Sequence, residues 1–183
     1  MKEKYNIINL IIAVIFTILG ITVPMLFHLF GLGSIFLPMY IPLAIGSYLM
    51  DKPDALIAGL LTPLISAVLT GMPPFYPPVA FIMMMQLPVF CFTISFISRI
   101  NSNYYVALIP AILLDRIILA VINYFILPLF ALNPLLVTAY DLLKGLPGII
   151  IMLVIVPLTV PQCRKLVAGM NLLPFEEYGE NNE

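Results

Sequence analysis

The chain has 183 residues, of which 62% are hydrophobic and only 9% are charged, and its net charge is −1. Its mean hydropathy is +1.12. A soluble domain of this size would leave much of that apolar surface in water, so the composition excludes a soluble globular protein. The net charge is too small to indicate any class of partner. We therefore expect an integral membrane protein.

Apolar stretches alternate with short polar or Pro/Gly-rich breaks along the whole chain. A helix needs about 20 apolar residues to cross a bilayer core. The sequence predicts an all-α membrane protein with six transmembrane helices in one domain, at 7–30, 34–50, 55–70, 79–98, 104–130 and 142–160, and a tail over 166–183. The second and third are short and contain proline, which is tolerated where protein or a water-filled cavity satisfies the freed backbone groups. We expect irregular helices beside an internal cavity.

The distribution of basic residues predicts the orientation in the membrane. If the N-terminus is cytoplasmic, six of the 8 Lys and Arg residues fall on the cytoplasmic side of the membrane: Lys2, Lys4, Lys52, Arg99, Arg164 and Lys165. Positively charged residues accumulate on the cytoplasmic side of membrane proteins. Both termini are therefore expected in the cytoplasm, and the chain is expected to be a multi-pass protein of the cell (plasma) membrane.

The sequence lacks the motifs of membrane enzymes. It has no P-loop, no H-E-x-x-H and no G-x-S-x-G, and its single histidine, His28, excludes a histidine-rich metal centre. Asp115 is the only acidic residue deep within a predicted helix, which excludes a pair of catalytic aspartates. We expect no enzyme activity, no cofactor and no metal site in this chain.

Four polar residues within the predicted helices are candidate ligand-binding residues or helix contacts. Asp115 and Arg116 are adjacent near the middle of the fifth helix, where a charge usually faces a cavity or the bundle interior. Asn123 lies on almost the same face as Arg116, about 10 Å further outward. Gln86 has a similar depth in the fourth helix. Two of them have a structural alternative: Asp115 as the partner of Arg116 or of a Ser or Thr on a neighbouring helix, and Gln86 as an interhelical hydrogen-bond donor.

Three further candidates lie toward the outer side. Lys144 starts the sixth helix, where it either guards an outward-facing pocket or only extends to the interface. Tyr76 belongs to a proline-rich outer loop that is stiff enough to cover a pocket, because proline fixes φ. Tyr40 is either a ligand contact or an interfacial anchor. These side chains place the predicted substrate site in the outer half of the protein.

Small residues at helical spacing mark a second kind of surface. Ala13 and Thr17 are four residues apart in the first helix, followed by Gly20. Such spacing allows close helix–helix contact, either within the bundle or with another membrane protein. No ring of pore charges and no internal repeat is visible, which favours a binder of a small solute over a channel or an inverted-repeat transporter.

Four motifs carry a resemblance to a known family. They are FLPMYIP at 36–42, GLLTPL at 59–64, GMPPFYP at 71–77 and KGLPG at 144–148. Together with six helices in about 180 residues, they resemble the substrate-binding S component of energy-coupling factor (ECF) transporters. The resemblance covers residues 5 to about 165. Relatives often have histidine at the position of Tyr40, and the contact motif Ala-x3-Ala of their first helix corresponds here to Ala13 and Thr17.

The resemblance implies a function in vitamin uptake across a prokaryotic cell membrane. An S component captures a water-soluble vitamin or precursor from outside, and a transmembrane coupling protein with two ATPase subunits drives its uptake. The expected partners are these subunits, a vitamin-like small molecule and membrane lipid, with no nucleic acid. Arg116 and Lys144 suit a carboxylate ligand, whereas pairing of Asp115 with Arg116 suits a neutral one. The alternatives are a stand-alone secondary transporter and a structural or assembly membrane protein.

Overall fold

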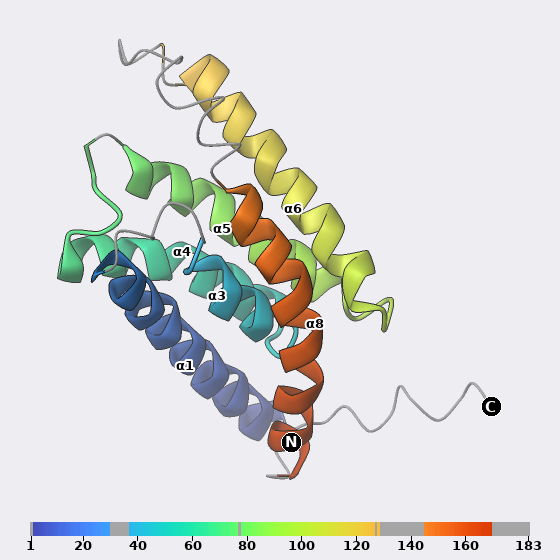
Figure 1. Ribbon diagram of the computed structural model, residues 1–183. Helices are drawn as coiled ribbons and strands as arrows, with labels where there is room; N and C mark the ends of the chain where they lie inside the picture. Colours follow the sequence, from blue (N-terminus) through green and yellow to red (C-terminus); the bar gives the residue numbers. More distant parts are fainter. Residues whose placement is uncertain (1, 30–36, 77, 127, 129–144, 170–183) are drawn as a thin grey trace.

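The computed structural model describes residues 2–29, 37–76, 78–126, 128 and 145–169, and in these ranges the fold is helical with no strand. The helices are α1 (Lys2–Leu29), α3 (Tyr40–Ser47), α4 (Lys52–Thr70), α5 (Val79–Ile97), α6 (Tyr104–Val121) and α8 (Leu146–Gly169). A π-helical turn, η1 (Ile122–Ile126), continues α6. Figure 1 shows α3 between α1 and α8.

Five of the described helices, α1, α4, α5, α6 and α8, are long and apolar enough to cross a membrane. Their outward faces carry large hydrophobic side chains, among them Ile11, Leu69, Leu113 and Ile150. Apolar surface this extensive is typical of a protein in contact with lipid. This confirms the predicted all-helical fold and is what a multi-pass membrane protein requires. Six spans and the location of the termini stay predictions.

The second predicted helix, 34–50, is much shorter in the structure. α3 has 8 residues, which is about 12 Å of helix and too short to cross a bilayer. Pro38 disfavours the right-handed helical conformation of the residue before it, and Leu37, with a φ of 49°, lies outside that conformation. Regular α-helix therefore begins only at Tyr40. Residues 30–36 lie outside the described residues.

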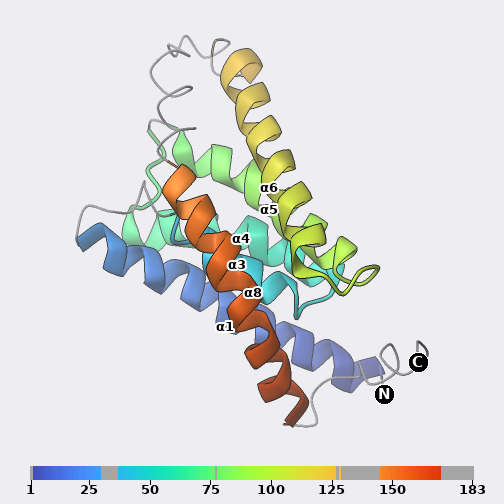
Figure 2. The ribbon, with the colours of Figure 1, turned by 45° about the vertical axis from the view of Figure 1, so that its right-hand side comes forward.

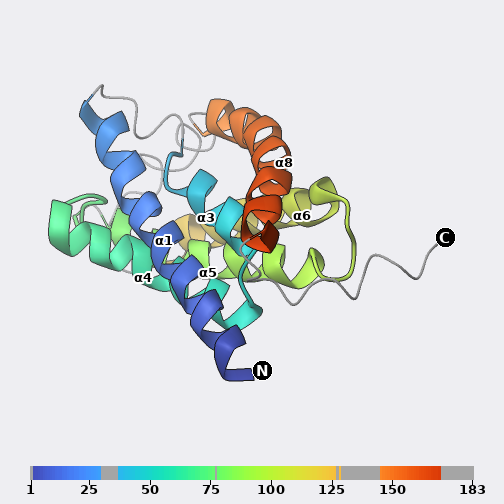
Figure 3. The same cartoon turned by 90° about the horizontal axis from the view of Figure 1, so that it is seen from below.

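Helix α3 occupies the centre of the bundle. It contacts α1, α4, α5 and α8, and the view from below shows these helices around it (Figure 3). Seven of its residues are buried: Tyr40, Pro42, Leu43, Ala44, Ile45, Gly46 and Ser47. Figure 2 shows α8 lying across α3. The first residue of α3, Tyr40, is thereby held inside the protein rather than at an interface.

The other helices differ from the predicted ranges mainly at their ends. α4 begins at Lys52, three residues before the predicted start, because Pro53 fits the first helical turn, where no N–H is needed. It ends at Thr70, and the capping residue that follows, Gly71, has a φ of 72°, which suits glycine. α8 continues to Gly169 through Pro157 and Pro161, nine residues beyond the predicted end. α4 is therefore a full-length helix in spite of Pro63.

Helices α4 and α5 approach each other closely at one glycine. A Cβ atom on Gly59 would lie 2.7 Å from the carbonyl oxygen of Leu87 and 2.8 Å from Cα of Pro88. These atoms belong to the α5 backbone, which cannot move aside as a flexible side chain can. Gly59 therefore sets the distance between the two helices, as small residues often do where membrane helices pack.

A polar cluster ties the helix ends together at one end of the bundle. Asn9 Nδ2 donates to Asp51 Oδ2 at 2.7 Å, and Arg99 forms an ion pair with Asp51. Arg164 Nη2 donates to the Tyr48 carbonyl at 3.3 Å, and the Tyr48 hydroxyl donates to the carbonyl of Tyr104 at 2.6 Å. Arg99 and Arg164 are two of the residues predicted to face the cytoplasm. The structure gathers them at one end, and the side of the membrane that this end faces stays a prediction.

Candidate functional site

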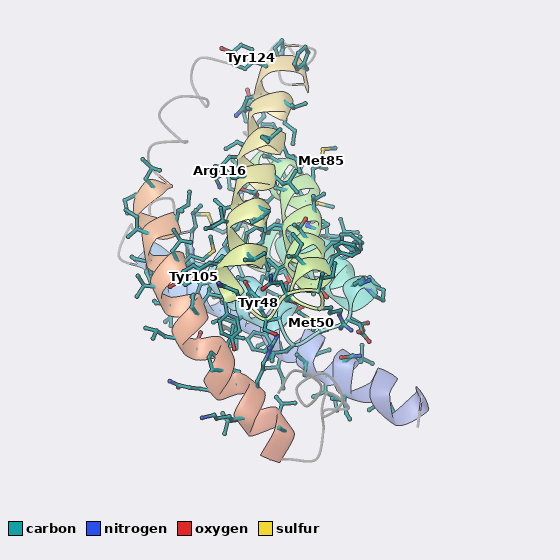
Figure 4. All side chains as sticks on the ribbon, turned by 90° about the vertical axis from the view of Figure 1, so that its right-hand side faces the viewer. Tyr48, Met50, Met85, Tyr105, Arg116 and Tyr124 are labelled. Atoms are coloured by element: carbon teal, nitrogen blue, oxygen red, sulfur yellow. The ribbon has the colours of Figure 1, made fainter. Side chains whose placement is uncertain are left out.

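A buried carboxylate, Asp115, lies at the middle of the candidate site. Its side chain is only 2% exposed. Its Oδ1 atom accepts from the Tyr40 hydroxyl at 3.0 Å, and its Oδ2 atom accepts from Nε and Nη2 of Arg116 at 3.0 and 2.7 Å. Arg116 lies between Tyr105 and Tyr124, which mark the two ends of α6 and η1 (Figure 4). Asp115 and Arg116 thus form an ion pair within the helix bundle.

Tyr40 is positioned for this contact by α3 and α5. It is the first residue of α3, and its ring packs edge-on against Phe90 of α5 with 5.2 Å between the ring centroids and an interplanar angle of 69°. Such edge-to-face packing fixes the direction of the phenol. The hydroxyl therefore points at Asp115, 75 residues away along the chain.

Gln86 joins the same cluster from α5. Its Nε2 atom donates to the backbone carbonyl of Asp115 at 3.2 Å, and the contact is buried. This is the interhelical hydrogen bond that the sequence left open as an alternative to ligand binding. Helices α3, α5 and α6 therefore all meet at Asp115.

Asn123 differs from every other buried polar residue that the structure describes. Its side chain is 0% exposed, and neither Nδ2 nor Oδ1 has a hydrogen-bond partner. It lies in η1, and π-helical turns within α-helices are frequent at functional sites. An unpaired buried amide costs about 1–3 kcal/mol. Asn123 is thus a donor and an acceptor without a partner in the structure.

Arg116 also keeps hydrogen-bonding capacity beyond its ion pair. A guanidinium group has five N–H donors in a fixed plane, and Asp115 accepts two N–H bonds, from Nε and Nη2. The Arg116 side chain is 16% exposed. Arg116 and Asn123 are seven residues apart, so they lie on nearly the same face of the helix. This face presents unused polar groups of both residues.

The remaining predicted residues do not join this cluster. Tyr76 is 81% exposed, so its side chain is outside the buried group. Lys144 lies outside the described residues. Thr17 is half-buried, with its hydroxyl 3.4 Å from that of Thr62 in α4, and Ala13 packs against the core. The roles predicted for these four residues stay predictions.

A pocket among the described residues lies away from this cluster. It has a volume of about 170 Å³ and is lined by Pro24, Met25, Ser66, Thr70 and Met72. Ser66 Oγ donates to the Met72 carbonyl at 2.6 Å, and Thr70 Oγ1 donates to the Ser66 carbonyl at 2.7 Å. Because its hydroxyls already have partners within the protein, this pocket is mainly apolar. It includes none of the predicted site residues.

Neither metal ligands nor known relatives add to this description. The described residues contain no group of three His, Cys, Asp or Glu side chains that would hold a metal ion. Comparison of the chain with family models, curated proteins and solved structures found no match. The candidate site therefore rests on its own geometry.

The unpaired amide of Asn123 leads to a prediction about stability. Asn123→Leu, which replaces the amide by an apolar group of similar size, is expected to raise the free energy of unfolding by about 1 kcal/mol. Removal of a polar group that serves only the fold would lower it instead. The measurement is detergent-solubilised unfolding, followed by circular dichroism. The matched control is Tyr124→Phe, because Tyr124 is the next residue of η1 and is 72% exposed, so no change is expected there.

Proposed function

We propose that the chain is the substrate-binding S component of an ECF-type transporter, and that it captures a small water-soluble vitamin or vitamin precursor from outside the cell. The observation that carries this proposal is the buried, unpartnered amide of Asn123, on the same helix as the ion pair of Asp115 and Arg116. The membrane-spanning length and apolar character of five described helices are compatible with it.

The energetics of Asn123 favour a binding function over a purely structural one. Polar side chains that only hold helices together have partners, as Gln86 does through Asp115. A buried amide without a partner lowers stability, and groups that cost stability in this way are typical of functional sites. A bound ligand would supply the missing hydrogen bonds. The site would therefore be stabilised only when it is occupied by a ligand.

Energy for uptake would come from the partner subunits, because the sequence contains no P-loop. The experiment is uptake of radiolabelled vitamins into proteoliposomes that contain the chain alone or together with a coupling protein and two ATPase subunits. We expect accumulation only with all subunits and ATP. Accumulation by the chain alone, driven by an ion gradient without ATP, would instead identify a secondary transporter.

A second prediction concerns the contact with the coupling protein. Thr17→Phe is expected to reduce co-purification of the coupling protein, because the bulky ring would separate α1 from the helix of the coupling protein that packs against it. Ligand binding by the isolated chain is expected to be unchanged. The control is Ile18→Phe, since Ile18 is exposed on the same helix and outside the predicted contact motif. Thermal unfolding of both variants distinguishes loss of docking from loss of folding, because Thr17 also touches Thr62. Equal co-purification of both variants would place the docking surface elsewhere.

A further inference from the structure

The charges near Asn123 cancel. Helix α3, helix α5 and η1 contain no charged residue, and the only two in α6 are Asp115 and Arg116. Arg116 donates two hydrogen bonds to Asp115 Oδ2, and Oδ1 accepts from Tyr40. The charged residues of α8, Arg164 and Lys165, are near the C-terminal end of that helix. The described part of the site is therefore polar but has no net charge.

The charge balance matters because the site is buried. A carboxylate that leaves water for a buried site loses several kcal/mol of hydration, and the strongest compensation for that loss is a nearby cation that is not already paired. The positive charge of Arg116 is already compensated by Asp115 at 2.7 Å. An anionic ligand could accept from the N–H groups of Arg116 that Asp115 does not use, but it would place a second negative charge beside the Asp115 carboxylate. A neutral polar ligand adds no charge and loses much less hydration free energy on burial.

The unpaired groups define the hydrogen-bonding pattern of the ligand. Asn123 offers one carbonyl acceptor and one NH₂ donor side by side, and both are buried and unpartnered. A side-chain amide pairs best with a group that presents an acceptor and a donor next to each other, as it does with the edge of adenine. The N–H groups of Arg116 that Asp115 does not use add donors on nearly the same face. Carbonyl or ring-nitrogen acceptors complement such donors.

We propose that the ligand is a neutral molecule with a carboxamide, or a nitrogen heterocycle with an adjacent donor and acceptor, and that Asn123 binds this edge in a bidentate manner. The inference rests on the proposed function and specifies the substrate class of the same site. It selects the neutral one of the two ligand types that the sequence left open. A free carboxylate is the excluded class.

The test uses pairs of compounds that differ at one group, which is neutral in one member of the pair and a carboxylate in the other. The purified chain alone is titrated with nicotinamide and nicotinate, panthenol and pantothenate, and biotinamide and biotin, with binding measured by isothermal calorimetry. In any pair that binds, we expect the neutral compound to bind at least about tenfold more tightly, which is about 1.4 kcal/mol. Its affinity should not change with ionic strength, because no net charge is paired on binding.

Two variants examine the origin of the preference. Asp115→Asn keeps the side-chain shape and leaves the Arg116 charge uncompensated, so the preference is expected to shift toward the carboxylate by about tenfold or more. If this variant does not fold, the ionic-strength series on the parent protein tests the same point. Asn123→Leu should abolish binding of the neutral compound, whereas Tyr124→Phe, altered at an exposed neighbour, should bind as the parent does.

The outcomes separate this inference from the proposed function. Tighter or equal binding of the carboxylate in the parent protein overturns the inference and leaves an S component with an anionic substrate. Binding of none of the six compounds also overturns it, because a carboxamide site would accept at least the smallest amide. The proposed function is decided independently by whether uptake into proteoliposomes requires the ATPase subunits.

Discussion

Asp115→Leu is expected to lower the free energy of unfolding by about 3–5 kcal/mol, the usual cost of breaking a buried ion pair by removal of one partner. The variant leaves Arg116 as a mostly buried charge and leaves the Tyr40 hydroxyl without its acceptor. The measurement is unfolding in mixed micelles with increasing SDS, in a Cys163→Ser background. A thiol-reactive dye then reports unfolding through Cys91, which is buried in the folded state.

The control for Asp115→Leu is the double variant Asp115→Leu with Arg116→Met. Replacement of both partners by apolar residues removes the buried charge altogether, and such replacements are often close to neutral. The double variant should therefore recover most of the stability that the single variant loses. Equal losses in the two variants would mean that Arg116 remains well solvated without Asp115. The ion pair would then not be the organising contact of α3, α5 and α6.

Gly59→Leu is expected to lower the free energy of unfolding by about 3 kcal/mol, and Gly59→Ala by about 1 kcal/mol. The physical reason is the contact of α4 with the α5 backbone, where even a Cβ atom would come within 2.7 Å of the Leu87 carbonyl oxygen. Helices α4 and α5 would have to separate. The same SDS titration with dye labelling of Cys91 measures the effect, since Cys91 is part of α5.

Gly169→Ala provides the matched control for Gly59. Gly169 is the last residue of another long helix, α8, and a Cβ atom there would meet nothing within 4 Å. No loss of stability is expected, because alanine has the higher helix propensity. A graded loss from Ala to Leu at Gly59, with none at Gly169, identifies backbone contact as the cause. Equal tolerance at both positions would contradict the close approach of α4 and α5.

Hydrophobic length and local breakers in the sequence predict most of the helix positions. α5 begins at Val79, directly after Pro78, as expected, and α6 begins at Tyr104, where the Asn103 side chain accepts from the Tyr105 N–H at 3.0 Å. Both boundaries depend on residues close in sequence. The short length of α3 was not predicted, because the apolar stretch around it has the composition of a full span.

The candidate site was predicted only in part, because its contacts join distant segments. Gln86, Arg116 and Asn123 stood out as polar residues in apolar helices. Pairing of Asp115 with Arg116 was one of two open possibilities. Adjacent helical residues point about 100° apart, so the two side chains meet only because the arginine side chain folds back toward Asp115. The bond from Tyr40 to Asp115 spans 75 residues. No local pattern indicates such a contact, because it depends on how α3 packs inside the bundle.

Native mass spectrometry of the chain, purified after incubation with a cell extract, tests the central claim most directly. We expect the parent protein and Tyr124→Phe each to carry one small-molecule adduct, and Asn123→Leu to carry none while remaining folded. That result would connect the unpartnered amide of Asn123 to ligand capture. An adduct of the same mass and occupancy on Asn123→Leu would contradict the account, because the buried amide would then have no part in binding.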